Sequence, residues 1–174
     1  MKRIFLLLAV VAMTAFQSCE GDPGPAGPPG ADGLIAEVFE VTTNFVPTAD
    51  PETSYRSFFD LNPAIFTSDV VLVYELSGVF DGNDIWKPLP QTYTFDNGGI
   101  LLYNFDFTVN DFSIFMDANF DRSTLDATWT QNRTFRIVII PGEFSNIIDV
   151  NNYNAVSETF GLENSEIKTL HPRN

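Results

Sequence analysis

The chain has 174 residues, and its 23 acidic residues against nine basic ones give a formal net charge of −14. Such a charge disfavours nucleic acid and anionic lipid surfaces as partners, because both attract lysine and arginine. Aromatic residues make up 14% of the chain, which excludes a predominantly disordered protein and predicts a packed core.

The first 18 residues have the pattern of a secretory signal. Lys2 and Arg3 precede an apolar segment, residues 4–16, that is too short to span a membrane stably. Ser18 then precedes Cys19, the only cysteine, as in a bacterial lipobox, although positions 16 and 17 lack the usual leucine and alanine. We therefore predict cleavage after residue 18 and a lipid on Cys19 that anchors the protein in a membrane. An ordinary signal followed by an incidental cysteine is the alternative.

The segment Gly21–Gly33 has glycine at every third position and proline between, which is the sequence rule of collagen. It holds only four full triplets, fewer than a stable triple helix generally needs. Residues 19–33 are therefore predicted to form a stiff polyproline-II tether that reaches roughly 45 Å, at about 3.1 Å per residue. The alternative is that the triplets seed a trimer, which requires the following domain to trimerise first.

Residues 34–174 have the length of one domain, and their apolar residues recur with a period of two. The first predicted strands are 34–42, 54–61 and 70–77. Val70–Leu76 is apolar on both faces, which indicates a central strand. Three later strands place their apolar side chains on one face: Leu101, Tyr103, Phe105 and Phe107; Phe112, Ile114, Met116, Ala118 and Phe120; and Phe135, Ile137 and Ile139.

Two turn sequences connect the later strands. Asp96–Gly99 contains Asn and Gly, which accept positive φ, and Thr108–Phe112 closes the next hairpin. Residues 91–120 are therefore predicted to form a three-stranded antiparallel meander. Because strands that are apolar on one face need a second sheet to cover them, we predict an all-β fold: an antiparallel β-sandwich of the jelly-roll or immunoglobulin-like type.

Two helical pieces are expected after the meander. Ser123–Asp126 has the form of a capping box that opens a single turn. Further on, Tyr153, Val156 and Phe160 recur at helical spacing, and Gly161 is placed to end the helix. The sequence thus predicts a short helix near the C-terminus, packed over an edge or an end of the sandwich.

Few residues offer catalytic chemistry. His171, the only histidine, lies near the C-terminus and is expected to be a solvated tail residue, so histidine-based nucleophilic catalysis lacks a base and zinc lacks ligands. No glycine-rich phosphate loop is present. We therefore predict that the protein is not an enzyme and carries no cofactor.

Two acidic clusters are weak candidates for calcium, because hard oxygen ligands on a loop suit that ion. The first holds Asp81, Asn83 and Asp84, and the second holds Asp117, Asn119 and Asp121. Neither completes a twelve-residue calcium loop, and Asp, Asn and Gly are the ordinary residues of turns. Paired carboxylates also serve glycoside hydrolysis, so a glycan-acting enzyme stays open as a less favoured reading.

Trp86 and Trp129 are the weak candidates for ligand contact. Each stands beside turn-forming residues rather than in the middle of a predicted strand, which leaves open a contact with sugar or peptide. The alternative is that both are core residues, the usual role of aromatic side chains in a phenylalanine-rich sandwich.

Several motifs together resemble a family of small collagen-like lipoproteins of Bacteroidetes: the signal, Cys19, the Gly-Xaa-Yaa run, and the segments "SDVVLVYEL", "DIWKPLPQTYTFDNGG", "YNFDFT" and "FRIVIIPGEF". The resemblance implies an envelope location and a single β domain, and it implies no activity and no site residues. In that group acidic residues directly after the lipidated cysteine direct export, and Glu20 and Asp22 match this in part, with Gly21 between them.

The predicted function is that of a cell-envelope lipoprotein, monomeric and held at the outer membrane or cell surface by lipid, that displays a binding or accessory module. Its expected partners are the membrane, through Cys19, and an envelope protein or glycan. The alternative from another class is a structural, trimeric envelope protein assembled through the collagen-like segment.

Overall fold

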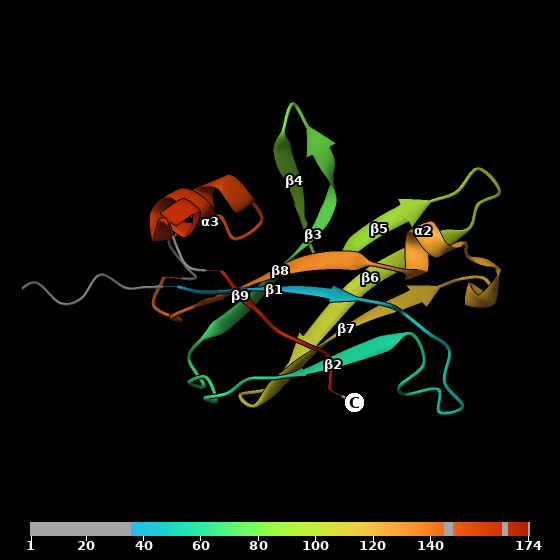
Figure 1. Cartoon of the computed structure of the whole chain (residues 1–174), viewed down its shortest axis with the longest axis horizontal. Helices are drawn as coiled ribbons and strands as arrows, with labels where there is room; N and C mark the ends of the chain where they lie inside the picture. Colours follow the sequence, from blue (N-terminus) through green and yellow to red (C-terminus); the bar gives the residue numbers. More distant parts are fainter. Residues whose placement is uncertain (1–35, 145–147, 165–166, 174) are drawn as a thin grey trace, which may run out of the picture. The chain divides into compact units, whose positions relative to one another are not determined.

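Two packed β-sheets form the body of the protein in the computed structural model (Figure 1). The structure describes residues 36–144, 148–164 and 167–173, all of which belong to one unit of internal contacts, Asp32–Asn174. The predictions made for the signal, for Cys19 and for the tether lie outside the described residues.

The five-stranded sheet has the order β4-β3-β8-β1-β9, with bounds Asn83–Pro88, Val70–Phe80, Arg133–Ile140, Glu37–Thr43 and Lys168–Thr169. Its pairs are antiparallel except that β9 runs parallel to β1. The four-stranded sheet is antiparallel, with the order β2-β7-β6-β5 and bounds Arg56–Asp60, Asp111–Ala118, Ile100–Phe107 and Gln91–Thr94. The predicted all-β sandwich, the meander β5-β6-β7 and the interior position of β3 are confirmed.

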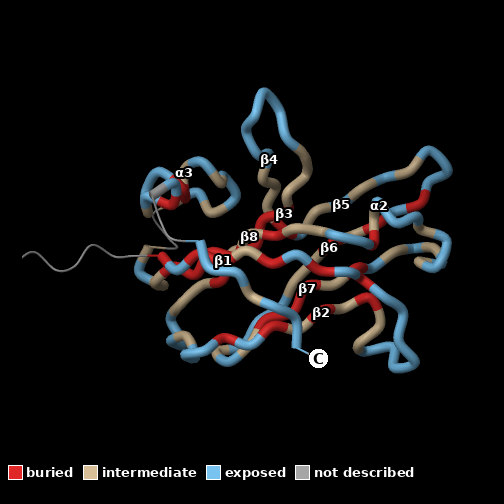
Figure 2. Tube along the Cα trace, in the orientation of Figure 1, coloured by how far each residue is buried: buried red, intermediate tan, exposed pale blue. Residues whose placement is uncertain are grey.

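The core between the sheets follows the predicted strand phase. Leu101, Tyr103 and Phe135 are fully buried, and their strands contribute alternate residues to the same cluster (Figure 2). Phe105 is only partly buried, and Phe107 is 42% exposed because it lies at the last position of β6, beyond the covering sheet. The alternation therefore predicts the face correctly and overestimates burial where the strand ends.

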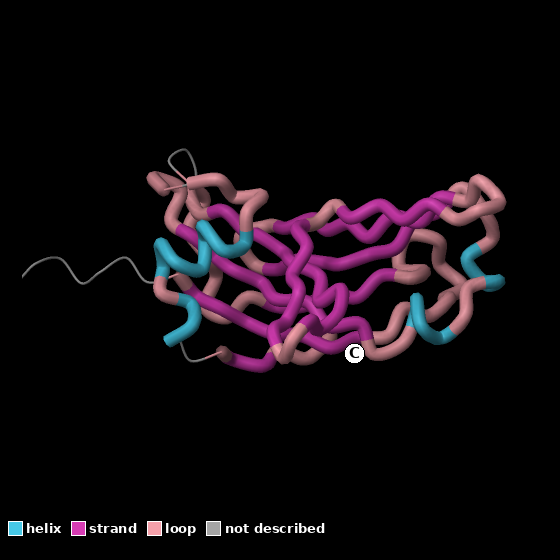
Figure 3. The backbone as a smooth tube through the Cα atoms, turned by 90° about the horizontal axis from the view of Figure 1, so that it is seen from above, coloured by secondary structure: helices cyan, strands magenta, loops and turns pink. Residues whose placement is uncertain are grey.

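The five-stranded sheet is apolar on both faces, so its outer face needs its own cover. Helix α3 (Tyr153–Phe160) supplies it: Val156 is fully buried and packs in a second cluster with Tyr74 and Val138. The predicted helix is confirmed, including its end at Gly161, whose φ of 62° is the left-handed conformation that glycine favours. The short η2 (Leu162–Asn164) follows it, and Figure 3 shows helical segments at both ends of the strands.

The predicted capping box at Ser123–Asp126 is wrong. Two single turns form instead, η1 (Arg122–Thr124) and α2 (Ala127–Thr130), and each is capped by an aspartate, Asp121 and Asp126. Each carboxylate accepts a hydrogen bond from the backbone N–H two residues later, at 2.9 and 2.8 Å. Aspartate is a strong cap, so these two residues determine where the turns begin.

Candidate functional site

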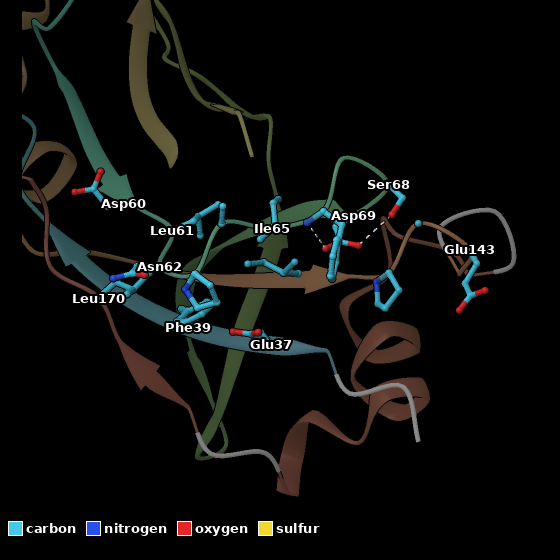
Figure 4. A pocket seen from close by; sticks show the side chains of 16 residues that line it. Glu37, Phe39, Asp60, Leu61, Asn62, Ile65, Ser68, Asp69, Glu143 and Leu170 are labelled. Atoms are coloured by element: carbon cyan, nitrogen blue, oxygen red, sulfur yellow. Dashed lines mark hydrogen bonds between the residues drawn. The ribbon is translucent and has the colours of Figure 1, made fainter. Parts of the chain in front are cut away.

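A groove of about 760 Å³ opens at the end of the sandwich where β8 ends and β1 begins (Figure 4). Four segments line it: the start of β1, the loop 60–69 after β2, residues 139–143, and the strand end at Leu170. The groove therefore combines segments from both sheets that are far apart in the sequence.

The floor of the groove is apolar. Phe39 and Ile139 come from the five-stranded sheet, while Leu61 and Ile65 come from the loop that leaves the other sheet. Phe39, Leu61 and Ile139 also belong to the central cluster and keep 6–8% of their surface exposed. The groove is thus an opening onto the hydrophobic core.

Backbone hydrogen bonds fix the walls of the groove. The N–H groups of Leu61 and Ile65 donate to the β6–β7 turn, at Asn110 and Val109, over 2.8 and 2.9 Å. The C-terminal segment after β9 bonds to both sheets: the Leu170 N–H donates to the Glu40 carbonyl at 3.0 Å, and the Arg173 N–H donates to the Phe58 carbonyl at 2.7 Å. Because these bonds join the wall segments to the β6–β7 turn and to strands β1 and β2, the groove is a preformed cavity.

The loop 60–69 also approaches the segment after β8 very closely. A Cβ on Gly142 would stand 1.8 Å from the backbone oxygen of Ser68, so only glycine fits there. In the same loop, a carboxylate oxygen of Asp69 accepts a hydrogen bond from the Phe66 N–H at 2.9 Å. The two segments thereby form one continuous wall.

Carboxylates form the rim of the groove. Its lining includes Glu37, Asp60, Asp69 and Glu143, and among the described residues it includes no lysine, arginine or histidine. Glu37 lies 3.8 Å from the Lys168 ammonium group, and the side chain of Asp60 pairs with a guanidinium outside the lining, that of Arg173. The hydrogen bonds that Arg173 donates to Asp60 and Asp111 raise the pKa of its guanidinium.

The opposite end of the sandwich is closed. The term "closed end" is used for the part of the sandwich formed by Phe45 and residues 93–99 and 119–135. There the Trp129 ring packs edge-on against Tyr93 and Phe95, with centroids 5.0 and 5.2 Å apart. Phe45, only 1% exposed, donates its N–H to the Thr130 carbonyl at 2.7 Å. What remains is a pocket of about 260 Å³, lined in part by Phe95 and Trp129.

A buried ionic network lies beneath the closed end. The carboxylate of Glu75 is fully buried and pairs with Arg133, and it accepts a hydrogen bond from the Tyr93 hydroxyl at 2.8 Å. Burial raises the pKa of Tyr93, and the hydrogen bond to Glu75 adds to the effect. Burial likewise raises the pKa of Tyr103, whose hydroxyl donates to the Trp129 carbonyl at 2.5 Å. The Arg133 Nε is buried without a hydrogen-bond partner among the described residues.

The two tryptophans occupy packing positions. Trp86 lies inside β4, so the expectation that it stands outside a strand is wrong; the guanidinium of Arg136 stacks on its ring at 4.1 Å. Trp129 lies in α2 at the closed end. The structure does not bring the two together in one site, and ligand contact by either stays a prediction.

The acidic clusters serve as turns. Asp81 has a φ of 50° and begins the β3–β4 turn, where the Asn83 side chain donates to its carbonyl at 3.2 Å; Asp84 follows in β4. In the second cluster Asp117, Asn119 and Asp121 each accept a backbone hydrogen bond. Within the described part of the chain, no three His, Cys, Asp or Glu residues gather as a metal site. His171 is exposed, as expected.

The sequence analysis missed the groove. Its lining comes from separate segments, and no spacing in the sequence relates the loop 60–69 to residues 139–143. One residue offered a signal in the sequence: Phe66 is a large aromatic residue that follows Asn62–Ile65 and lies outside any alternating strand. In the structure its ring is 79% exposed.

No family model matches the chain, and no curated protein or solved structure shows significant similarity to it. Along the ranges 36–144, 148–164 and 167–173, no helix is long and apolar enough to cross a membrane.

Proposed function

We propose that the protein is a cell-envelope lipoprotein, anchored through Cys19 at the outer membrane or cell surface, that binds its ligand in the groove. The groove carries the proposal, because a preformed opening of about 760 Å³ with an apolar floor and a polar rim has the size and chemistry of a ligand site. The lipobox-like sequence before Cys19 supports the anchor.

Binding rather than catalysis suits the groups at the rim. Glycoside hydrolysis requires one carboxyl group to deliver a proton and a second to act across the substrate. Glu37 and Asp60 each have a basic partner, and Asp69 is hydrogen-bonded within its own loop. These partners hold the carboxylates in place around an apolar floor, and the enzyme reading stays the less favoured alternative.

A neutral dye tests the ligand site. Nile red, whose fluorescence rises in apolar surroundings, is titrated into the secreted chain carrying Cys19→Ser. We expect saturable fluorescence that Ala64→Trp abolishes, because Ala64 is an exposed residue of the lining and the indole fills the groove. Ala49→Trp, at an exposed alanine in the β1–β2 loop, is the matched control and should leave binding unchanged. Equal binding by both variants would contradict the proposed site.

Fractionation tests the anchor. The wild-type protein should sediment with membranes, and Cys19→Ser should either appear in the soluble fraction or retain its signal, because the variant lacks the thiol that receives the lipid. If the variant fractionates and migrates like the wild type, Cys19 carries no anchor and the envelope location fails.

The structural alternative, a trimer, has one observation in its favour. The β3–β4 hairpin projects from the sheet and exposes Val79, Phe80 and Ile85 by 62%, 75% and 41% (Figures 1 and 2). Exposed apolar groups at such a site suit contact between chains.

Light scattering decides between the monomer and the trimer: we expect a monomer at all concentrations. A trimer that dissociates when Gly24, Gly27 and Gly30 become alanine would make the collagen-like segment the assembly device.

A further inference from the structure

We propose that the groove binds a peptide segment that carries lysine or arginine next to bulky apolar side chains. This inference rests on the proposed function and names its ligand class. It is carried by two properties of the same groove, the charge of its rim and the apolar character of its floor and edge.

The charge of the rim selects for a cation. Of the four carboxylates in the lining, Asp69 and Glu143 have no basic partner within the described ranges of the chain. Among the described residues the lining has four carboxylates and no basic side chain, and the nearby Lys168 and Arg173 are already paired with Glu37 and Asp60, so the charge at the rim favours a cationic over an anionic ligand. Opposite charge raises the association rate and excludes wrong partners, and a cationic ligand therefore has the advantage.

The carboxylates are spread along the groove. In Figure 4 Asp69 and Glu143 lie toward one end and Asp60 toward the other, with Leu61 and Ile65 between them. Over the described residues, no three acidic, histidine or cysteine side chains converge as they would around a metal ion. An extended ligand with cationic groups on flexible stems fits this spacing better than a single ion.

The apolar part of the ligand has its own contacts. Phe66 lines the groove and is 79% exposed, which is unusual for so large an apolar ring. Together with the floor at Phe39 and Ile139 it offers contact to a leucine or phenylalanine side chain. A peptide presents such side chains at adjacent positions to lysine and arginine, whose apolar stems also pack along the floor.

Calorimetry with three blocked pentapeptides tests the inference: Leu-Phe-Leu-Lys-Lys, the charge-reversed Leu-Phe-Leu-Glu-Glu, and Ser-Ser-Ser-Lys-Lys. We expect the first to bind at least about tenfold more tightly than either of the others, because it alone satisfies both the rim and the floor. Its affinity should also fall as salt rises from about 0.05 to 0.5 M, because salt screens the rim charges.

Two pairs of variants locate the contacts. Glu143→Gln should weaken the lysine peptide about threefold, the scale of an exposed ion pair, while Glu52→Gln, an exposed glutamate in the β1–β2 loop, should have no effect. Phe66→Ala should weaken it about fivefold or more, while Phe80→Ala, at the equally exposed ring of the β3–β4 hairpin, should not.

The outcomes separate the two proposals. Equal affinity for the lysine and glutamate peptides, or equal effects of Glu143→Gln and Glu52→Gln, would overturn the cationic class. If Nile red still binds and Ala64→Trp still abolishes its binding, the groove stands as a ligand site and only the ligand class fails. If neither dye nor peptide binds, the proposed function fails as well.

Discussion

At the closed end of the sandwich, aromatic rings fill the space between the sheets, whereas at the groove end the same sheets leave an apolar floor open to solvent. Trp129 contacts Tyr93 and Phe95 edge-on at the closed end, and a pocket of only about 260 Å³ remains. At the groove end the opening is about 760 Å³. One pair of sheets therefore supports a packed end and an accessible end.

The two ends differ in how the loops that connect their strands are hydrogen-bonded to the rest of the protein. At the closed end the connection between β7 and β8 places a tryptophan over the sheets and hydrogen-bonds to Phe45. At the groove end the loop 60–69 is bonded outward, to the β6–β7 turn, and its large ring at Phe66 points into solvent rather than the core. A loop braced by its backbone can leave apolar surface uncovered, which a binding site requires.

The closed end should be the more sensitive to truncation. Phe135→Ala removes a fully buried ring that contacts Phe45 and Tyr103, and it should lower the free energy of unfolding by about 3–5 kcal/mol in urea denaturation. Phe105→Ala should cost less, because that ring is only partly buried. Phe66→Ala, at the groove, should change stability by less than about 0.5 kcal/mol. Equal losses at Phe135 and Phe66 would refute the contrast between the ends.

The ionic network is the second test of the closed end. Arg133→Leu leaves the fully buried Glu75 without its cation and should destabilise the protein by about 3 kcal/mol, with Tyr93 still donating one hydrogen bond. Arg173→Leu, which breaks exposed pairs beside the groove, is the control and should cost much less, because solvent screens exposed pairs. Chemical denaturation of both variants measures the difference; similar losses would show that burial of the pair is unimportant.

At the groove end one position should be sensitive for a steric reason. Gly142→Ala would place its Cβ 1.8 Å from the Ser68 backbone oxygen, so the wall must move, at a cost of about 1–3 kcal/mol. Binding of Nile red should weaken in parallel, because the same wall lines the groove. Gly78→Ala, where a Cβ meets nothing within 4 Å, is the matched control. Unchanged stability and binding in Gly142→Ala would mean that the two segments are not in contact.

The smallest effect is expected on the outer face of the four-stranded sheet. Burial opposes ionisation of Asp106, but hydrogen bonds from Ser113 and Arg56 outweigh it and lower the pKa. A lowered pKa in the folded state stabilises the protein above the unfolded value, near 3.8, and this stabilisation is lost as pH falls through the folded value. Asp106→Asn should therefore cost less than about 1 kcal/mol at pH 7, since the carboxylate is largely exposed. The cost should shrink below about pH 4 in denaturation curves, and a cost that grows there would contradict the sign.

Local patterns predicted most of the fold. Alternation over Leu101–Phe107 and the turn at Asp96–Gly99 gave the meander, because pairing and turn type depend on residues adjacent in sequence. Spacing and Gly161 gave α3. The capping box failed because Asp121 and Asp126, rather than Ser123, cap the two turns, a choice that residue types alone do not decide.

Local sequence patterns could not predict the groove. Phe39 and Ile139 lie in predicted strands with no sign of exposure, and only the path of the loop 60–69 leaves them open to the groove. Trp129 also depends on long-range packing: Tyr93 and Phe95 contact its ring, and with Phe95 it lines the smaller pocket, which its sequence neighbours did not predict. Sites formed by segments that are far apart in the sequence depend on tertiary contacts, and such contacts leave no periodic pattern in the sequence.

Chemical-shift mapping tests the contrast between the ends most directly. Backbone amide spectra of the secreted chain carrying Cys19→Ser are recorded as the lysine-containing pentapeptide is added. The account predicts that the largest shifts cluster at residues 61–69, at Glu143 and at the start of β1, and that amides around Trp129 stay unchanged. Shifts centred on Trp129 and Phe95, with the groove unaffected, would contradict it.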